Sequence, residues 1–177
     1  LGGRRSGGGS CHTERLLKPV TIQIEPVGHI SSPVTEPVDH GWGDIVSLVR
    51  LNPEFAAGLT GLDRCSHVIV VFWMHDAKFE LATDLTRHHR GRTDMPKTGP
   101  FAQRARDRPN RIGITPVKLL GVDGATITVQ ELDAIDGTPV LNVKPYMPVF
   151  DRVNEATVPE YIDRFLADYF LAAGLSP

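Results

Sequence analysis

Four arginines lie close together in one short stretch of the chain, residues 101–113, between two apolar segments. They are Arg104, Arg106, Arg108 and Arg111. So many cations are not buried together, and the Pro109-Asn110 pair between two of them interrupts any helix or central strand. The stretch is therefore predicted to be a positively charged loop on a rigid scaffold, where binding and catalysis usually occur. A solvated basic loop is the alternative when the stretch is considered alone.

The charge of the surrounding segment favours an anionic partner. Residues 87–111 contain eight Lys or Arg and two Asp side chains, a local charge of +6 in a chain whose formal charge is −2. The rest of the chain therefore carries −8. This polarity indicates one face that binds an anion, with phosphate as the first candidate. We interpret His88 and His89 in this segment as surface residues rather than metal ligands.

A second unusual stretch, residues 136–146, could form a ligand pocket. Asp136-Gly137 is typical of a turn, Pro139 fixes the entry to a strand, and Lys144-Pro145-Tyr146 places a cation and an aromatic ring at its far end. Asp133 lies just upstream. One interpretation is a hairpin corner with Lys144 in an ion pair. The other is a pocket in which the backbone of the turn binds the edge of an adenine or a ribose.

Other arrangements of catalytic residue types are weak. His67 and His75 share one face of an expected strand, but two histidines without a third ligand favour hydrogen bonding over metal binding. A triad of Ser66, His67 and Asp63 is discounted because neighbouring residues on a strand point in opposite directions. The sequence has no P-loop, paired CxxC or HExxH motif.

The composition is that of a globular protein with one core: 177 residues, 41% hydrophobic and 23% charged. We expect residues 1–18 to be a disordered tail and residues 19–177 a single domain. The tail lacks the apolar segment of a secretory signal, and the longest apolar run, residues 68–74, is too short to cross a bilayer. Cys11 and Cys65 are not expected to pair, so we predict a cytoplasmic protein.

The elements that must hold these residues are mostly short strands. Strands are predicted at residues 21–30, 45–51, 66–74, 112–122, 125–132 and 139–143, with a hairpin turn at 122–125 and a short helix capped by Asn52 that ends near Gly58. An amphipathic helix is predicted at 158–173, ended by Gly174. The pattern favours a mainly β fold, a small antiparallel barrel with one or two peripheral helices, and excludes a doubly wound nucleotide-binding fold because no GxGxxG unit is present. Apolar residues of the last helix exceed what a barrel needs, which predicts a homodimer.

Four blocks, in order, resemble the TsaA/TrmO-like family of S-adenosylmethionine-dependent methyltransferases. Val27–Pro33 is similar to the family's Ile-Gly-x-Ile-x-Ser-Pro, and Gly58–His75 to its Gly-Leu-Glu-x-Phe-Ser-His strand. Phe101–Gly113 is similar to Phe-Ala-Thr-Arg…Arg-Pro-Asn-Pro-Ile-Gly, and Asp136–Tyr146 to Asp-Gly-Thr-Pro-Val-x-Asp-Ile-Lys-Pro-Tyr. The chain departs from the family at Gln103, at Ala105-Arg106, at Arg111 and at Asn142, and in the loop Asp39–Trp42 that replaces Pro-Arg-Gln.

The resemblance implies an antiparallel barrel, usually a homodimer, that binds S-adenosylmethionine and methylates a threonylcarbamoyladenosine-type base in tRNA. The implied cofactor residues are Asp39, His40, Trp42, Met74, His75, Arg104, Ile114, Gly137, Thr138, Pro139 and Val140. Arg106, Arg108, Asn110, Arg111, Lys144 and Tyr146 would bind the tRNA or another anionic substrate. No metal is implied, and no catalytic residue is assigned, although His75 or Asp133 could accept a proton. A non-catalytic module that binds RNA or an adenine nucleotide, or a methyltransferase for a small anionic metabolite, remain the alternatives.

Overall fold

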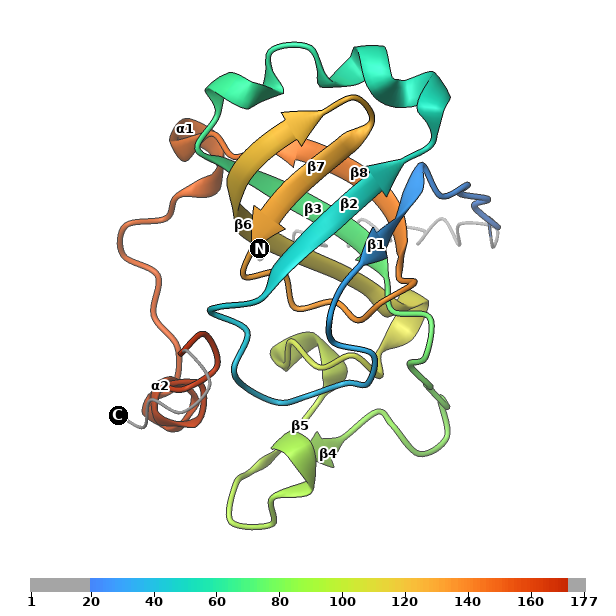
Figure 1. Cartoon of the computed structure of the whole chain (residues 1–177). Coiled ribbons are helices and arrows are strands. Elements are labelled where there is room, and N and C mark those ends of the chain that lie inside the picture. Colours follow the sequence, from blue (N-terminus) through green and yellow to red (C-terminus); the bar gives the residue numbers. More distant parts are fainter. Residues whose placement is uncertain (1–19, 172–177) are drawn as a thin grey trace, which may run out of the picture.

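A closed six-stranded antiparallel barrel forms the body of the computed structural model, which describes residues 20–171 (Figure 1). The strands follow one another around the barrel in the order β1, β2, β7, β6, β3, β8. Their bounds are β1 Gly28–Ser31, β2 Val46–Leu51, β3 His67–Trp73, β6 Ile112–Asp123, β7 Thr126–Gln130 and β8 Pro139–Pro145. Closure pairs every strand on both sides and so leaves no exposed edge. The expected mainly β architecture is confirmed.

Short elements lie outside the barrel. Between β3 and β6 a long excursion carries a separate two-stranded sheet, β4 Arg87–His88 with β5 Lys97–Thr98. Five 3-10 turns and two short α-helices complete the elements of the described residues: η1 Pro53–Leu59, η2 Leu62–Arg64, η3 His89–Gly91, η4 Pro100–Ala102, η5 Pro109–Arg111, α1 Pro148–Asp151 and α2 Glu160–Phe165. The helix predicted after Asn52 is thus a 3-10 helix. Asn52 makes no side-chain cap there, and its carbonyl accepts the N–H of Phe55 instead.

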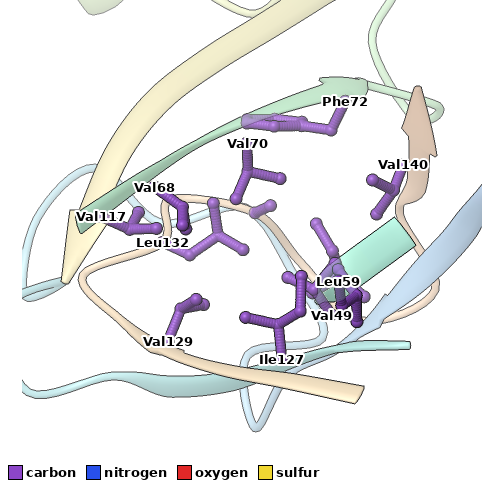
Figure 2. Packing of buried hydrophobic residues seen from close by; sticks show 12 residues of the cluster. Val49, Leu59, Val68, Val70, Phe72, Val117, Ile127, Val129, Leu132 and Val140 are labelled. Atoms are coloured by element: carbon purple, nitrogen blue, oxygen red, sulfur yellow. The ribbon is translucent and has the colours of Figure 1, made fainter. Parts of the chain in front are cut away.

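The core fills the interior of the barrel with aliphatic side chains from all around the sheet (Figure 2). β3 contributes Val68, Val70 and Phe72, which alternate with residues on the outer face and pair with β6 on one side and β8 on the other. Each fully buried aliphatic or aromatic side chain contributes about 1.5–3 kcal/mol. The apolar β-branched run predicted to be a central strand is therefore β3, which pairs with β6 on one side and β8 on the other.

The hairpin predicted at 122–125 joins β6 to β7. Gly124 has a φ of +56°, which glycine adopts without strain, and Asp123 pairs with Thr126 across the turn. The Asp-Gly pair at 123–124 therefore correctly predicted the turn between β6 and β7.

The first predicted strand is wrong in its extent. β1 begins at Gly28, and the alternating side chains before it, Val20, Ile22 and Ile24, are exposed. No neighbouring strand extends beside them, so their alternation has no sheet face to bury against. Pairing within the barrel begins at Val27, whose N–H donates to the carbonyl of Val140 at 2.8 Å.

The last predicted helix is also shorter than expected. α2 ends at Phe165, and the chain continues in turns to Leu171. After the helix, the carbonyl of Tyr169 accepts the N–H of Trp42 at 3.2 Å. Gly174, the tail predicted at residues 1–18 and Cys11 lie outside the described residues.

Candidate cofactor and substrate site

Four segments that are distant in sequence gather at one end of the barrel. They are the β1–β2 connection, the excursion between β3 and β6, the β7–β8 connection and the C-terminal segment that contains α2 (Figure 1). Side chains join them in pairs. Arg90 Nε lies 3.1 Å from Asp39 Oδ1, and the Tyr169 hydroxyl lies 2.9 Å from Asp133 Oδ2. We call this end the barrel mouth.

The loop Asp39–Trp42, expected to contact the cofactor, reaches the mouth as predicted from the resemblance. Asp39 pairs with Arg90, His40 is exposed, and the loop turns at Gly41 with a φ of +81°. Trp42 is 2% exposed, and its indole Nε1 is buried without a hydrogen-bond partner among residues 20–171. An unpaired buried donor costs about 1–3 kcal/mol, so this N–H lowers the stability of the loop.

The end of β3 meets the turn before β8. His75 Nδ1 lies 3.4 Å from the hydroxyl of Thr138, which is buried, and the N–H of Met74 donates to the carbonyl of Arg111. The structure therefore brings together Met74, His75 and the turn Gly137–Val140, as the resemblance implied.

Most backbone groups of the turn are already paired. The N–H groups of Asp136, Gly137 and Thr138 donate to the carbonyls of Val34, Ile30 and Ile135, and Pro139 has no N–H. The carbonyls of Thr138 and Val140 accept the N–H groups of Ile30 and Val27. A ligand at this turn would therefore meet the carbonyls of Gly137 and Pro139, which suit an amino group such as that of adenine.

Arg104 and Ile114 are in direct contact, since Arg104 Nη2 donates to the carbonyl of Ile114. The next residue on β6, Thr115, donates its hydroxyl to Asp133 Oδ1. Burial raises the pKa of the Tyr169 hydroxyl well above its ordinary value, and the Asp133 carboxylate raises it further. The hydroxyl therefore stays protonated and donates to Asp133.

The basic stretch is a loop, but its arginines have different surroundings. Arg106 is half-exposed beside Asp107, at 3.7 Å. Arg108 donates to the carbonyl of Gln103 at 3.2 Å. Arg111 donates to the carbonyl of Ala77 at 2.9 Å, and its guanidinium carbon lies 4.4 Å from the ring centre of Trp73. Arg111 is thus partly a structural residue.

Three of the predicted substrate residues line one open pocket of about 530 Å³. The pocket is bounded by Arg108, Asn110 and Arg111 on one side and by residues 77–80 on the other. Asn110 and Arg111 have φ values of +62° and +53°, so the backbone there is strained for residues with a Cβ. Strain of this kind is often retained at functional sites.

Lys144 and Tyr146 lie elsewhere. β8 leaves the mouth at Pro139, and its far end is roughly 20 Å away at the usual rise per residue. Lys144 lines a separate pocket of about 320 Å³ with Ile69, Met147 and Phe150, and Tyr146 packs near His67. Within one chain these two residues do not join the arginines of the basic loop.

Some residues of the mouth were missed by the sequence interpretation. Arg90 stacks on the ring of Phe165 at 4.5 Å and pairs with Asp39, and Tyr169 reaches Asp133. No sequence motif predicts these contacts, because the partners are far apart along the chain. Gln103, a departure from the family, is buried and donates to the carbonyls of Arg87 and Thr98, so it holds β4 and β5 together.

Comparison with known proteins gives consistent results. The family model of the tRNA-methyltransferase O N-terminal domain matches residues 35–152. A probable S-adenosyl-L-methionine-binding protein of Pyrococcus abyssi is 38% identical over 142 residues, which are 77% of this chain and 74% of the relative. The chain belongs to the TrmO N-terminal domain family.

A solved structure and a human protein are also similar to this chain. The crystal structure of TrmO from Pseudomonas aeruginosa has a TM-score of 0.63 and 31% identity, and covers 78% of this chain and 62% of that one. The human tRNA (adenine(37)-N6)-methyltransferase is 38% identical over 120 residues, 68% of this chain and 25% of the relative. The chain thus spans less than two thirds of these two relatives.

The described residues contain neither a helix that could cross a membrane nor a cluster of metal-ligating side chains. Between residues 20 and 171 no helix has the length and apolarity to cross a membrane. The same residues contain no group of three or more His, Cys, Asp or Glu side chains placed to hold a metal ion.

Proposed function

We propose that this TrmO family member is an S-adenosylmethionine-dependent methyltransferase that N-methylates a modified adenosine in tRNA. The observation that carries the proposal is the family match over residues 35–152, which spans the β1–β2 loop, the basic loop and the turn before β8. Relatives are named S-adenosyl-L-methionine-binding proteins and tRNA (adenine(37)-N6)-methyltransferases. The cytoplasm is the proposed location, in keeping with a tRNA substrate.

The barrel mouth offers the contacts that such a cofactor needs. Arg104 is an exposed cation for the carboxylate of the methionine end, and the turn Gly137–Val140 presents acceptors for the adenine amino group. These residues fit S-adenosylmethionine, and the fit needs no metal.

When bound, the cofactor supplies an already activated methyl group, so the protein's task is alignment and exclusion of water. His75, held by Thr138 at the end of β3, could take up a proton at Nε2. Trp42 and Val140 are both buried and so are shielded from solvent. No residue has to act as a nucleophile.

Phosphates of the substrate are proposed to lie on the basic loop. Arg106 is half-exposed, and Arg108, Asn110 and Arg111 line the open pocket beside it. Phosphate contacts position a nucleic acid, and they make its affinity depend on salt.

A homodimer is also proposed, on a different surface from the one first considered. Phe165 and Tyr169 of the C-terminal segment pack against Arg90, whereas Phe170 of the same segment stays 48% exposed. The outer face of β6 forms surplus apolar surface, because Ile112 and Ile114 are 40% and 49% exposed on adjacent outward positions. Light scattering at micromolar concentration should give a dimer mass, and Ile112→Glu should lower it; a monomer mass for the unmodified chain contradicts the proposal.

Calorimetry with S-adenosylmethionine and S-adenosylhomocysteine, with and without a chelator, tests cofactor binding. A cofactor at one hundred times its dissociation constant should stabilise the fold by about 2.7 kcal/mol. Labelled methyl transfer to bulk tRNA then separates the enzyme from a non-catalytic RNA- or nucleotide-binding module. Transfer to a small anionic metabolite and not to tRNA would favour the remaining alternative.

A further inference from the structure

A carboxylate and a guanidinium are anchored on consecutive residues of β6. Asp133 accepts the hydroxyl of Thr115, and Arg104 donates to the carbonyl of Ile114. Both charged groups come from loops at the barrel mouth, and Asp133 also accepts the hydroxyl of Tyr169. The mouth therefore holds a carboxylate and a guanidinium that are anchored on adjacent residues of one strand.

Tyr169 is carried there by the C-terminal segment, residues 160–171. Its hydroxyl donates to Asp133 Oδ2 at 2.9 Å, and its carbonyl accepts the N–H of Trp42 at 3.2 Å. Arg90 lies 5.7 Å from its ring centre. The segment is outside the residues matched by the family model, 35–152, so this cover belongs to the chain's own C-terminal part.

The closed arrangement leaves one donor unsatisfied. Trp42 Nε1 is buried without a partner among the residues that the structure describes, although the backbone N–H of the same residue is bonded to the segment. The segment therefore contacts Trp42 through its backbone and leaves the indole N–H of Trp42 unpaired.

We propose that Asp133 and Arg104 form a clamp for the zwitterionic amino-acid end of S-adenosylmethionine, and that the Tyr169 hydroxyl occupies the ammonium position at Asp133 in the ligand-free chain. Asp133 accepts from the ammonium and Arg104 binds the carboxylate, each through a charge-assisted hydrogen bond. A phenol hydroxyl and an ammonium are both donors, which allows one to replace the other. The inference rests on the proposed function.

The first test compares two ligands by calorimetry: S-adenosylmethionine, and 5′-methylthioadenosine, which lacks the amino-acid end. Asp133→Asn should weaken S-adenosylmethionine about 10- to 100-fold and leave methylthioadenosine within about twofold. Tyr169→Phe removes the competing donor and should tighten S-adenosylmethionine about threefold or more, again without changing methylthioadenosine. Equal losses for both ligands in Asp133→Asn, or an unchanged or weaker affinity in Tyr169→Phe, overturn the inference.

A second variant displaces the segment without touching the clamp. A Cβ on Gly43 would lie 2.0 Å from the carbonyl oxygen of Phe170, whereas a Cβ on Gly58 meets nothing within 4 Å. Gly43→Ala should therefore tighten S-adenosylmethionine as Tyr169→Phe does, and Gly58→Ala should match the unmodified protein. A weaker affinity in Gly43→Ala means that the segment completes the site, which contradicts its role as a stand-in.

Hydrogen–deuterium exchange of the unmodified protein provides a readout without any substitution. Addition of S-adenosylmethionine should speed exchange in residues 160–171, and slower exchange there overturns the stand-in role. If S-adenosylmethionine and methylthioadenosine both fail to bind the unmodified protein, the proposed function fails and the inference fails with it. If both bind but respond alike to every variant, only the inference fails.

Discussion

Arg111 offers a sharp test of the difference between a solvated cation and a structural one. Its guanidinium stacks at 4.4 Å on Trp73 and donates to the carbonyl of Ala77 at 2.9 Å. The stack is worth about 0.5–1 kcal/mol and the charged hydrogen bond about 1.5–3 kcal/mol. Because the residue is only partly buried, Arg111→Ala should lower the free energy of unfolding by about 2–3 kcal/mol.

Urea denaturation measures this loss. With a slope of roughly 2 kcal/mol per molar, the midpoint should fall by about 1 M without a change of slope. Arg106→Ala, at a half-exposed side chain, is the matched control and should stay within about 0.5 kcal/mol. Arg111→Gly also loses the side chain but relieves the φ of +53°, and should be about 1 kcal/mol more stable than Arg111→Ala. If Arg111→Ala unfolds like the unmodified protein, Arg111 is an ordinary solvated cation and the contacts carry no stability.

Three further predictions concern ligand affinity, packing and pH. Arg104→Ala should weaken S-adenosylmethionine by about 2–4 kcal/mol in calorimetry, while Arg106→Ala should leave it unchanged and flatten the salt dependence of tRNA binding by about one unit; equal cofactor affinity for both variants removes Arg104 from the site. A Cβ at Gly28 would lie 2.2 Å from a carbonyl oxygen of β2, so Gly28→Ala should cost at least about 2 kcal/mol of unfolding free energy, whereas Gly58→Ala should not destabilise. His89, interpreted from the sequence as a surface residue, is instead buried at 6% exposure. Burial lowers the pKa of the His89 imidazole, so the unfolded chain takes up the proton more readily, and stability should fall as the pH drops below about 6.5. His89→Gln should reduce this slope, and an unchanged slope would contradict the assignment.

The sequence predicted those parts of the fold whose signals are local. The apolar β-branched run at 66–74 became β3, and the Asp-Gly pair at 123–124 became the β6–β7 turn. Residues 21–27 alternate as a strand would, but whether they pair depends on neighbouring strands that no local pattern reports. Strand extent is therefore decided by the closure of the barrel.

The site was predictable as a set of loops and not as a set of contacts. Motif resemblance assigned His75 and Thr138 to one site, and the structure places the two side chains 3.4 Å apart; their role in cofactor binding stays a prediction. The roles of Arg111 and Tyr169 depend on partners that are distant in sequence, Trp73 and Asp133. The sequence alone therefore identified Arg111 only as a cation and Tyr169 only as part of an apolar helix face. Helical periodicity predicted a helix to residue 173, whereas α2 ends at Phe165 and the chain continues in turns, with the carbonyl of Tyr169 bonded to the distant N–H of Trp42.

The central claim is methyl transfer from S-adenosylmethionine to an adenosine of tRNA, and its most direct measurement is a labelled-methyl assay with purified protein and bulk tRNA, followed by digestion to nucleosides. If the proposed activity is right, label should appear on the N6 nitrogen of a threonylcarbamoyladenosine-type nucleoside. The label should be lost with Arg104→Ala. Cofactor binding without any label in tRNA nucleosides would contradict the proposed activity.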